Sequence, residues 1–525
     1  RQTISWPPRL LLTTSHRCHV QPEVRLGSVG WENVAGPPSH RYTLTLRAVQ
    51  ATSWVGFGIA ESGSMKGADI VVYDHSTGKL TDQFGGVENS RPMVDECQDW
   101  VLLSSGLEEN VISVHMQRKL DTGDKQDRSF IDDVVDPLSP TPIIAAWGNN
   151  GYGYHGENRI MGRVRFFAPG GVPPVSRIAQ LAADNAISHG EVRANDQVIT
   201  NSTTTMYVNL CTDVATALGL NNTLEHPFQH IVALNAVISP ATRANVHHLT
   251  VRGTNKVCGN LTNMDLYASE MTHLWVWGPG VEASFLPDVA GIRILGPAGG
   301  EGYRAFIVQY HYDNAAGATG LVDSSGFDFY ATAALRPNDV AILQVGDPYL
   351  TMITTPVIPS GTNETAHSLA KFTSGVCTNY FAADNVTVFM QYLHMHKIGT
   401  RMMSRVLRDG QVVRSDWVDY YDFNMAGAFN PRSTGAGFEL RRGDVLETSC
   451  WYTQLEGATQ HFGVGSSDEM CINFLFYYPA QAVPNGNVCG PTTPNTTLEH
   501  VEVTEAEVGR VFGSAGSVCV PPPTP

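Results

Sequence analysis

The chain has 525 residues, more than one hydrophobic core supports, so we expect two to four domains. Its net charge of −16 argues against nucleic acid or an anionic membrane surface as a partner. Only 16% of the residues are charged, while 50 glycines and 30 prolines indicate many turns, so we expect a mostly β protein. No apolar run in the sequence is long enough for a membrane span.

Residues 1–167 are predicted to form a β-sandwich domain. Short segments at 42–48, 54–60, 68–73, 111–116 and 162–167 have the composition and alternation typical of strands. A Pro/Gly-rich stretch begins at Ala168, and we interpret residues 168–204 as a linker. The β pattern resumes at Thr205 and continues to about Tyr478. The tail contains one helical candidate at 497–512 and ends in a polyproline segment.

Histidines at strand ends predict metal sites. His394 and His396 follow an apolar β-branched run, and because side chains alternate on a strand they share one face. The pair His247-His248 ends another apolar stretch, and His311 lies in a third. Met470 directly precedes the apolar run 472–478. Imidazole combined with thioether suits copper that cycles between Cu(I) and Cu(II), because soft sulfur stabilises Cu(I).

Cysteines and glycosylation sequons indicate an oxidising, secretory compartment. The nine cysteines are spread along the chain without a Cys-x-x-Cys motif, which favours disulfides over a zinc cluster. Six Asn-x-Ser/Thr sequons predict N-glycosylation at Asn201, Asn221, Asn260, Asn363, Asn385 and Asn495. The first residue, Arg1, fits either a removed signal peptide or a start that lies elsewhere.

The order of these motifs resembles that of the copper type II, ascorbate-dependent monooxygenases. The resemblance covers about 205–479: the His-His pair, the strand Gln309-Tyr310-His311-Tyr312, then Asp323-Ser324-Ser325-Gly326, the His-Met-His stretch and Glu469-Met470-Cys471. The runs 55–59 and 67–72 resemble a DOMON domain, which this family often carries at its N-terminus. The resemblance implies an all-β chain with a DOMON sandwich at 1–167. Two jelly-roll-like copper domains at 205–346 and 347–482 and a tail at 483–525 would follow.

The resemblance also implies two unequal copper sites. His247, His248 and His311 would hold the electron-transfer copper, while His394, His396 and Met470 would hold the copper that binds O2 and attacks the substrate. Ascorbate would reduce both ions, and one oxygen atom would enter a substrate C–H bond. Gln309 and Tyr477 are the further candidate residues near these sites.

Three positions bear on the substrate. Phe474 stands where related enzymes often have tyrosine, which removes a hydroxyl. Tyr392 replaces the arginine that anchors peptide carboxylates in the amidating branch, so a glycine-extended peptide is a poor candidate. Glu364, near a glutamate proposed to face the amine in the dopamine branch, lies inside a sequon.

By the same resemblance, cysteine pairs stabilise the domains. The expected disulfides are Cys450–Cys471, Cys377–Cys489 and Cys211–Cys258, with Cys18–Cys97 inside the DOMON domain. Cys519 would then be free or would join two chains in a homo-oligomer.

The DOMON domain would bind haem, a structural cation or no ligand at all. Haem would use Met65, Met93 or His155, which are otherwise loop and surface residues. By resemblance to the dopamine β-hydroxylase branch, a structural cation, Ca²⁺ or Na⁺, would use Asp69 and Asp99, which are otherwise turn residues.

The sequence therefore predicts a secreted, glycosylated copper monooxygenase that acts on a small molecule with O2 and ascorbate. The alternative is a non-catalytic extracellular glycoprotein that uses the same domains for adhesion or assembly.

Overall fold

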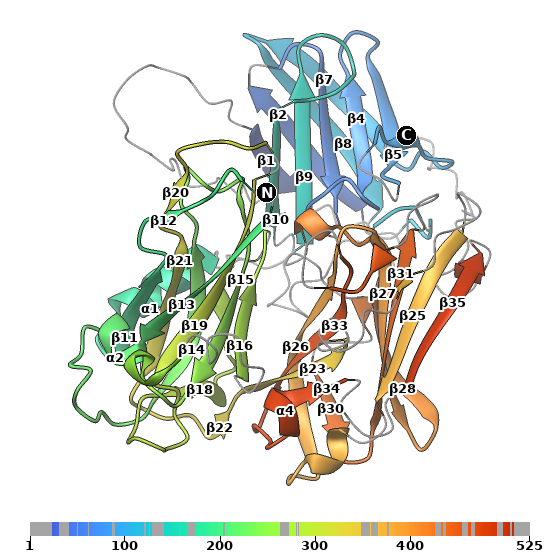
Figure 1. Ribbon diagram of the computed structural model, residues 1–525. Coiled ribbons are helices and arrows are strands. Elements are labelled where there is room, and N and C mark those ends of the chain that lie inside the picture. Colours follow the sequence, from blue (N-terminus) through green and yellow to red (C-terminus); the bar gives the residue numbers. More distant parts are fainter. Residues whose placement is uncertain are drawn as a thin grey trace. The chain divides into compact units, whose positions relative to one another are not determined.

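The structure is a computed structural model, and two compact units divide it: Arg1–Pro169 with Val508–Pro525, and Gly170–Glu507. It describes residues 24–30, 41–49, 51–60, 62–86, 90–119, 122–124, 126–128, 141–156, 158–164, 174–202, 205–262, 272–279, 281, 283–314, 316–347, 357–358, 366–374, 377–425, 432–433, 437–453, 460–463, 468–490, 497–504 and 507–508. Strands dominate both units (Figure 1), which confirms the all-β class. Every helix in the described ranges is too short or too polar to cross a membrane.

The first unit is a sandwich of two antiparallel sheets. Their strand orders are β1–β2–β8–β7 and β10–β9–β3–β4–β5–β6. The strands are β1 (Val24–Gly30), β2 (Arg41–Val49), β3 (Trp54–Ile59), β4 (Asp69–Asp74), β5 (Lys79–Phe84), β6 (Met93–Val94), β7 (Val101–Glu108), β8 (Val111–Lys119), β9 (Thr141–Gly148) and β10 (Arg159–Val164).

Alternating burial on β8 shows how this sandwich forms. Ile112, Val114 and Met116 are completely buried and pack with Phe57 and Val71 of the other sheet, while the residues between them are partly exposed. The period of two places one face of the strand in the core. Arg118 is the next residue in this inward series, so a cation enters the end of an otherwise apolar core.

The second unit contains two sandwiches. In the first, the sheets have the orders β11–β21–β14–β18–β22, with β17 beside β14, and β13–β19–β15–β16. Its elements are α1 (Pro174–Ala183), β11 (Ile187–Arg193), β12 (Gln197–Val198), β13 (Thr205–Asp213), α2 (Val214–Ala217), β14 (Gln229–Val237), β15 (Val246–Thr254), η1 (Cys258–Asn260), β16 (Thr272–Trp277), β17 (Ser284–Phe285), β18 (Ala290–Ile294), β19 (Ala305–Asp313), β20 (Val322–Asp323), β21 (Gly326–Thr332) and β22 (Asn338–Asp339).

The second sandwich has the sheet orders β30–β26–β33–β23–β34 and β29–β28–β27–β31–β25–β35. Its elements are β23 (Ala341–Gly346), β24 (Val357–Ile358), β25 (Ala366–Ser374), η3 (Cys377–Tyr380), β26 (Asn385–Met395), β27 (Gly399–Arg408), β28 (Gln411–Val418), η4 (Phe423–Met425), β29 (Arg432–Ser433), β30 (Phe438–Arg441), β31 (Val445–Thr453), β32 (Gln460–His461), β33 (Cys471–Tyr478), α4 (Pro484–Asn487), β34 (Val488–Cys489) and β35 (Thr497–Thr504).

Each sandwich of the second unit buries one face of each sheet. In the first, Val308 and Tyr310 of β19 and Leu249 of β15 join a core with residues of β14 and β21. In the second, apolar side chains of β26 and β33 pack against those of β25, β27 and β31. The outward face of β19 and β15 is therefore available for polar side chains.

Three disulfides lie in these sandwiches: Cys211–Cys258, Cys377–Cys489 and Cys450–Cys471. They are the pairings expected from the resemblance. Cys97 is also disulfide-bonded, whereas Cys18, its predicted partner, lies outside the described residues, as does Cys519.

Three segments differ from the expectations. Part of the predicted linker forms α1 and the strand β11, which pairs with β21 and so belongs to the first sandwich. The strand β23, placed in the first copper domain from sequence, pairs with β33 and begins the second sandwich. Residues 497–504, predicted to be helical, form β35 beside β25. Local composition is compatible with either structure in each case, and the pairing partner decides the outcome.

Candidate metal centre

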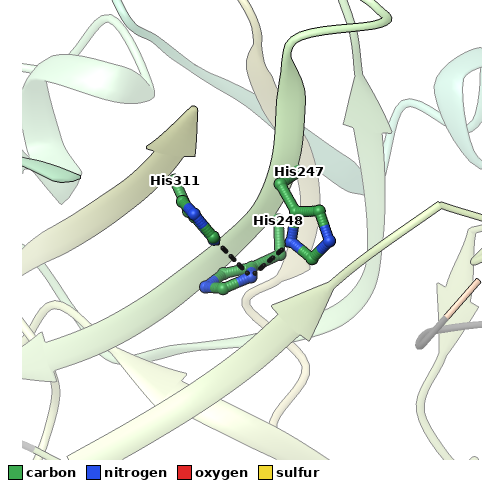
Figure 2. A group of neighbouring side chains, drawn as sticks. All are labelled: His247, His248 and His311. Atoms are coloured by element: carbon green, nitrogen blue, oxygen red, sulfur yellow. Dashed lines mark hydrogen bonds between the residues drawn. The ribbon is translucent and has the colours of Figure 1, made fainter. Parts of the chain in front are cut away.

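Three histidines meet on the outward face of the sheet that contains β15 and β19. His248 and His311 are cross-strand partners, and their Nδ1 atoms are 3.2 Å apart (Figure 2). The Nδ1 atom of His247 lies 3.1 Å from that of His248. One ring nitrogen from each histidine falls within 4.8 Å of the others, so this first histidine set can hold one metal ion.

A β-bulge explains how two consecutive histidines serve the same site. Neighbouring residues on a regular strand point to opposite faces. The pairing of β15 with β19 shifts register between Val246 and His248, so His247 is the extra residue of a bulge. The bulge turns His247 toward the nitrogens of His248 and His311.

Burial keeps these imidazoles neutral. It lowers the pKa of His247 to about 4 and that of His311 to about 2, and it holds the pKa of His248 well below its ordinary value. Neutral imidazole is the form that binds metal. The Nε2 atom of His247 is buried without a hydrogen-bond partner, which a metal bond would satisfy. The three nitrogens therefore fit a copper ion.

A buried carboxylate supports both strands of this set. Asp323 is completely buried and accepts hydrogen bonds from the hydroxyls of Thr242, Ser325 (2.6 Å) and Tyr312 (2.9 Å). Tyr312 follows His311 on β19, and Thr242 lies in the turn that leads into β15, where its carbonyl accepts from the Val246 amide. Asp323 thus connects the two histidine-bearing strands.

A second histidine set lies at the end of β26. The rings of His394 and His396 have centroids 5.1 Å apart. The Nδ1 of His396 lies 2.9 Å from the Asp468 carbonyl, so Nδ1 carries the proton and Nε2 is the nitrogen that would bind a metal. His394 is buried with a lowered pKa, and its Nδ1 has no hydrogen-bond partner. These nitrogens also fit a metal ion.

Strand pairing places the backbone of Met470 next to this second set. Met395 of β26 is the partner of Cys471 of β33, which places Met470 beside His396 in register. The Met470 carbonyl accepts from the hydroxyl of Tyr452 at 2.8 Å, and the Cys450–Cys471 disulfide follows directly. The Met470 backbone is thus held from two sides.

The two histidine sets approach each other. The rings of His248 and His394 have centroids 6.2 Å apart. Phe423 contacts one histidine of each set, stacking on His247 at 4.1 Å and meeting His396 edge to face at 5.4 Å. Sequence reasoning predicted two separate groups of ligands but missed Phe423, since an aromatic residue in a loop carries no metal-binding signal.

Comparison with known proteins identifies two domains of the chain. Residues 338–502 match the copper type II ascorbate-dependent monooxygenase C-terminal domain, and residues 40–135 match the DOMON domain. The chain therefore contains a copper type II ascorbate-dependent monooxygenase C-terminal domain and a DOMON domain. It is 28% identical to rat dopamine beta-hydroxylase over 448 residues, 81% of this chain and 66% of that protein.

Other relatives are similarly distant. Mouse DBH-like monooxygenase protein 1 is 26% identical over 455 residues, 82% of this chain and 68% of that protein. Tyramine beta-hydroxylase of Caenorhabditis briggsae is 28% identical over 289 residues, 52% of this chain and 46% of that protein. The monooxygenase chain thus spans about two thirds of dopamine beta-hydroxylase and less of the tyramine enzyme.

The two further candidate site residues, Gln309 and Tyr477, lie in different parts of the fold. Gln309 shares the outward face of β19 with His311 and approaches the side chain of Asn209 at 3.4 Å. Tyr477 is completely buried in the second sandwich, among residues such as Val388 and Leu475. It points to the opposite face of β33 from Phe474, so its predicted catalytic role is corrected to core packing. Two other tyrosines lie near the histidines: the ring of Tyr392 is 6.1 Å from that of His394, and the ring of Tyr207 stacks on His311 at 4.2 Å.

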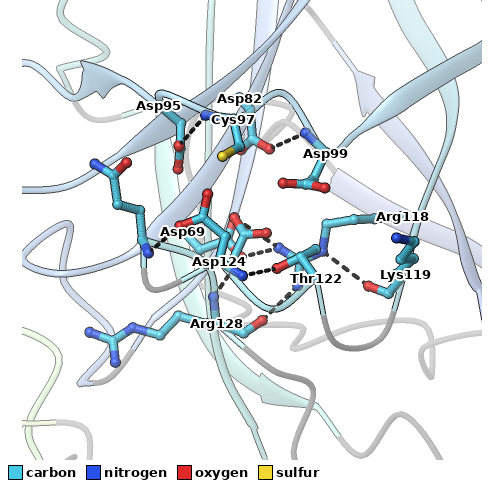
Figure 3. Close-up of polar contacts among 12 residues, drawn as sticks. Asp69, Asp82, Asp95, Cys97, Asp99, Arg118, Lys119, Thr122, Asp124 and Arg128 are labelled. Carbon is cyan, nitrogen blue, oxygen red and sulfur yellow. Dashed lines mark hydrogen bonds and ion pairs between the residues drawn. The ribbon is translucent and has the colours of Figure 1, made fainter. Parts of the chain in front are cut away.

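The DOMON unit contains a buried acidic cluster (Figure 3). The predicted cation ligands fall into different parts of it. Asp69 forms an ion pair with the fully buried guanidinium of Arg118 and accepts the Arg128 amide at 2.9 Å. Asp99 donates its amide to Asp82 at 3.0 Å. The guanidinium of Arg118 therefore already neutralises the charge of Asp69. The sequence had predicted that a metal ion would do so.

Carboxylates still outnumber guanidiniums in this cluster. Oxygens of Asp69, Asp82 and Asp127 form one close group, and oxygens of Asp95 and Asp124 lie close together beside the disulfide-bonded Cys97. Burial raises the pKa of Asp127 to about 8 and that of Asp95 to about 6. One oxygen each of Asp95 and Asp124 is buried without a hydrogen-bond partner. Excess carboxylates of this kind take up either protons or a hard cation.

The haem candidates differ in burial. Met65 packs beside the Trp54 group, Met93 is 53% exposed, and His155 holds its Nδ1 2.8 Å from the Gly156 carbonyl. An exposed methionine and a hydrogen-bonded imidazole are typical of surface positions rather than of haem ligands.

Proposed function

We propose that this chain inserts one oxygen atom of O2 into a substrate C–H bond, using two copper ions and ascorbate. The other oxygen atom leaves as water, and ascorbate supplies the electrons. The observation that supports this most is the pair of buried histidine sets, which face each other at 6.2 Å between the rings of His248 and His394. Bound copper would supply the one-electron redox chemistry that the reaction requires.

The two sets differ in ligand chemistry, and this difference suits one set to electron transfer and the other to O2 binding. His247, His248 and His311 offer nitrogen alone and form the electron-transfer site. Met470, whose backbone lies in register with His396, would add a thioether to His394 and His396, and thioether favours Cu(I). The second set is therefore assigned to O2 and the substrate.

Residues around the second set indicate an apolar substrate. On the face of β26 and β33 that carries His394, the side chains of Tyr392, Phe474 and Ile472 form an apolar cluster with Met470. The relatives are named for hydroxylation of dopamine and tyramine. We expect hydroxylation at a benzylic carbon, and a screen of phenolic amines against other benzylic compounds identifies the substrate class.

The compartment of this enzyme is proposed to be secretory. The second unit holds three disulfides, which persist in oxidising compartments. Four sequon asparagines are exposed, as glycosylation requires, and Asn363 and Asn495 lie outside the described residues; the four are Asn201, Asn221, Asn260 and Asn385. A homo-oligomer through Cys519 stays a proposal.

The DOMON unit is proposed to hold one hard cation. With Asp69 paired to Arg118, the cation would bind Asp95 and Asp124, whose oxygens lie close together, while the charge of Asp99 acts on both. Calcium-dependent thermal stability of the full chain tests this assignment.

Metal analysis and oxygen uptake test the proposed reaction. Purified full-length chain should bind two copper ions and consume O2 with ascorbate and a hydroxylatable substrate. His394→Ala should abolish the uptake, while His189→Ala, a control at an exposed position on β11, should leave it unchanged. A chain that takes up no copper would favour the adhesive or assembly role.

A further inference from the structure

A buried arginine lies on the sheet face that carries the first histidine set. Arg252 follows His248 by four residues on β15, and the pairing with β19 is regular between them, so both side chains point to the outward face. Four residues correspond to about 13 Å along a strand, which places Arg252 outside the metal set itself. Arg252 is only 8% exposed. The face therefore carries a buried cation in addition to its neutral imidazoles.

Asn209 of β13 places an unused hydrogen-bond donor beside this guanidinium. Its Oδ1 accepts from Arg252 at 3.0 Å and from the Gln309 side chain at 3.4 Å, so the other end of the amide is the NH2 group. Asn209 is also 8% exposed, and its Nδ2 atom is buried with no hydrogen-bond partner among the described residues. An unpaired buried donor is costly, so this NH2 group suits an acceptor that a ligand brings.

The apolar cluster of the second sandwich adjoins this polar group. His273 of β16 is the cross-strand partner of Arg252, and its ring lies 5.9 Å from that of Phe474 on β33. The ring of Phe474 is 5.8 Å from that of Tyr392, which is 6.1 Å from that of His394. Burial, together with the charge of Arg252, lowers the pKa of His273 to about 3, so His273 is neutral. Aromatic surface therefore leads from the cation to the second histidine set.

We propose that Arg252 and Asn209 bind a carboxylate of the substrate, so that the preferred substrate is an arylalkyl carboxylate rather than an amine. The inference rests on the proposed function, because it names the substrate class of the same site. The carboxylate accepts from the guanidinium and from the Asn209 NH2 group, while the aryl group packs on Phe474 and Tyr392. The guanidinium repels the ammonium group of an amine. The reaction is unchanged: one atom of O2 enters the benzylic C–H bond, and the other leaves as water with two electrons from ascorbate.

Three phenols that share a benzylic CH2 group but differ in charge test the substrate class. The probe p-hydroxyphenylpropionate carries a carboxylate, tyramine carries an ammonium group, and p-ethylphenol is uncharged. In the wild type, kcat/KM for the acid should exceed that for tyramine by about tenfold. Arg252→Gln should keep its copper, lower kcat/KM for the acid about tenfold and change that for p-ethylphenol less than about twofold. Arg252→Lys keeps the charge without the planar fork and should recover part of the loss.

Calorimetric titration of the acid into the full chain without ascorbate measures binding without turnover. Arg252→Gln should bind p-hydroxyphenylpropionate about tenfold more weakly than the wild type. Asn209→Asp can still accept from Arg252, but it replaces the NH2 group by a carboxylate oxygen that repels the ligand, so it should also weaken binding about tenfold. Arg193→Gln is the matched control, because it removes one guanidinium from the other sheet of the same sandwich, where Arg193 pairs with Asp328 at 2.6 Å. It should bind the acid as the wild type does.

The results separate this inference from the proposed function. A wild type that oxidises tyramine or p-ethylphenol in preference to the acid overturns the inference and leaves the proposed function standing. Binding of the acid that depends on Arg252 and Asn209, without any oxygen uptake, supports the carboxylate site and overturns the proposed function. An equal loss for all three probes in Arg252→Gln, or the same loss in Arg193→Gln, would show that Arg252 acts only on the fold. If Arg252→Gln does not fold, Asn209→Asp and the preference of the wild type among the probes decide.

Discussion

Replacing Asp323 should weaken the first metal site while sparing the second. Three hydroxyl groups donate to this completely buried carboxylate, those of Thr242, Ser325 and Tyr312. A hydrogen bond to a charged group contributes roughly 1.5–3 kcal/mol. Asp323→Ala leaves all three donors without their acceptor, so we expect a loss of about 5 kcal/mol in the free energy of unfolding.

Asp323→Asn is the more informative variant. Its amide oxygen can still accept from Thr242 and Ser325, which both donate to Oδ1, but its NH2 group then faces the Tyr312 hydroxyl. One charge-assisted bond is lost, so the free energy of unfolding should fall by about 2 kcal/mol. Because Tyr312 adjoins His311, copper affinity of the first set should fall about tenfold.

Denaturant unfolding and copper titration against a competing chelator measure these effects. Asp328→Asn is the matched control, since Asp328 lies on the neighbouring strand β21 and pairs with Arg193 at 2.6 Å. The control should retain both copper ions with unchanged affinity. Equal loss of both copper sites in Asp323→Asn, or an unchanged first site, would refute the reasoning.

Three further predictions concern the proposed ligands and the DOMON cluster. His311→Ala should remove the first copper, keep the second and lower kcat rather than substrate affinity; full turnover, measured by oxygen uptake, would make the first site structural. Met470→His should keep copper, as metal analysis will show, but lose most turnover, because imidazole lacks the preference of thioether for Cu(I). Burial raises the folded-state pKa of Asp95 to about 6 and of Asp127 to about 8, above the unfolded value near 4. The folded state then binds more protons, so without a cation the DOMON unit should lose stability as pH rises from about 4 to 8. Calorimetry in chelator should show this slope, and Ca²⁺ should flatten it; the same slope with and without Ca²⁺ would contradict the proposed cation.

The strands and the ligand types were predictable because each depends on a short local pattern. The alternation in β8 places Ile112, Val114 and Met116 inward, and His394 and His396 share a face for the same reason. Residues whose role depends on distant partners were not predictable. The strand β23 looks equally suited to either sandwich, and only its pairing with β33 assigns it.

In the candidate site, too, the sequence did not predict roles that depend on distant partners. Tyr477 and Tyr392 are both tyrosines in apolar strands, yet Tyr477 packs in the core and Tyr392 lies near His394. The β-bulge at His247 changes which face each later residue occupies, so counting along the strand fails there. Phe423 reaches His247 across about 176 positions of sequence, and only the folded chain brings them together.

The late position of β35 imposes an order on how the second unit is built during synthesis. Strands β11 to β22 form a contiguous sandwich that can close once Asp339 has left the ribosome. The second sandwich must wait for Cys489, which pairs with Cys377 across 112 positions, and for Thr504, which ends β35. Until then one side of β25 exposes unpaired backbone groups, a template for pairing with another chain. Chaperones would therefore be needed longest for the half of the second unit that holds the proposed oxygen site.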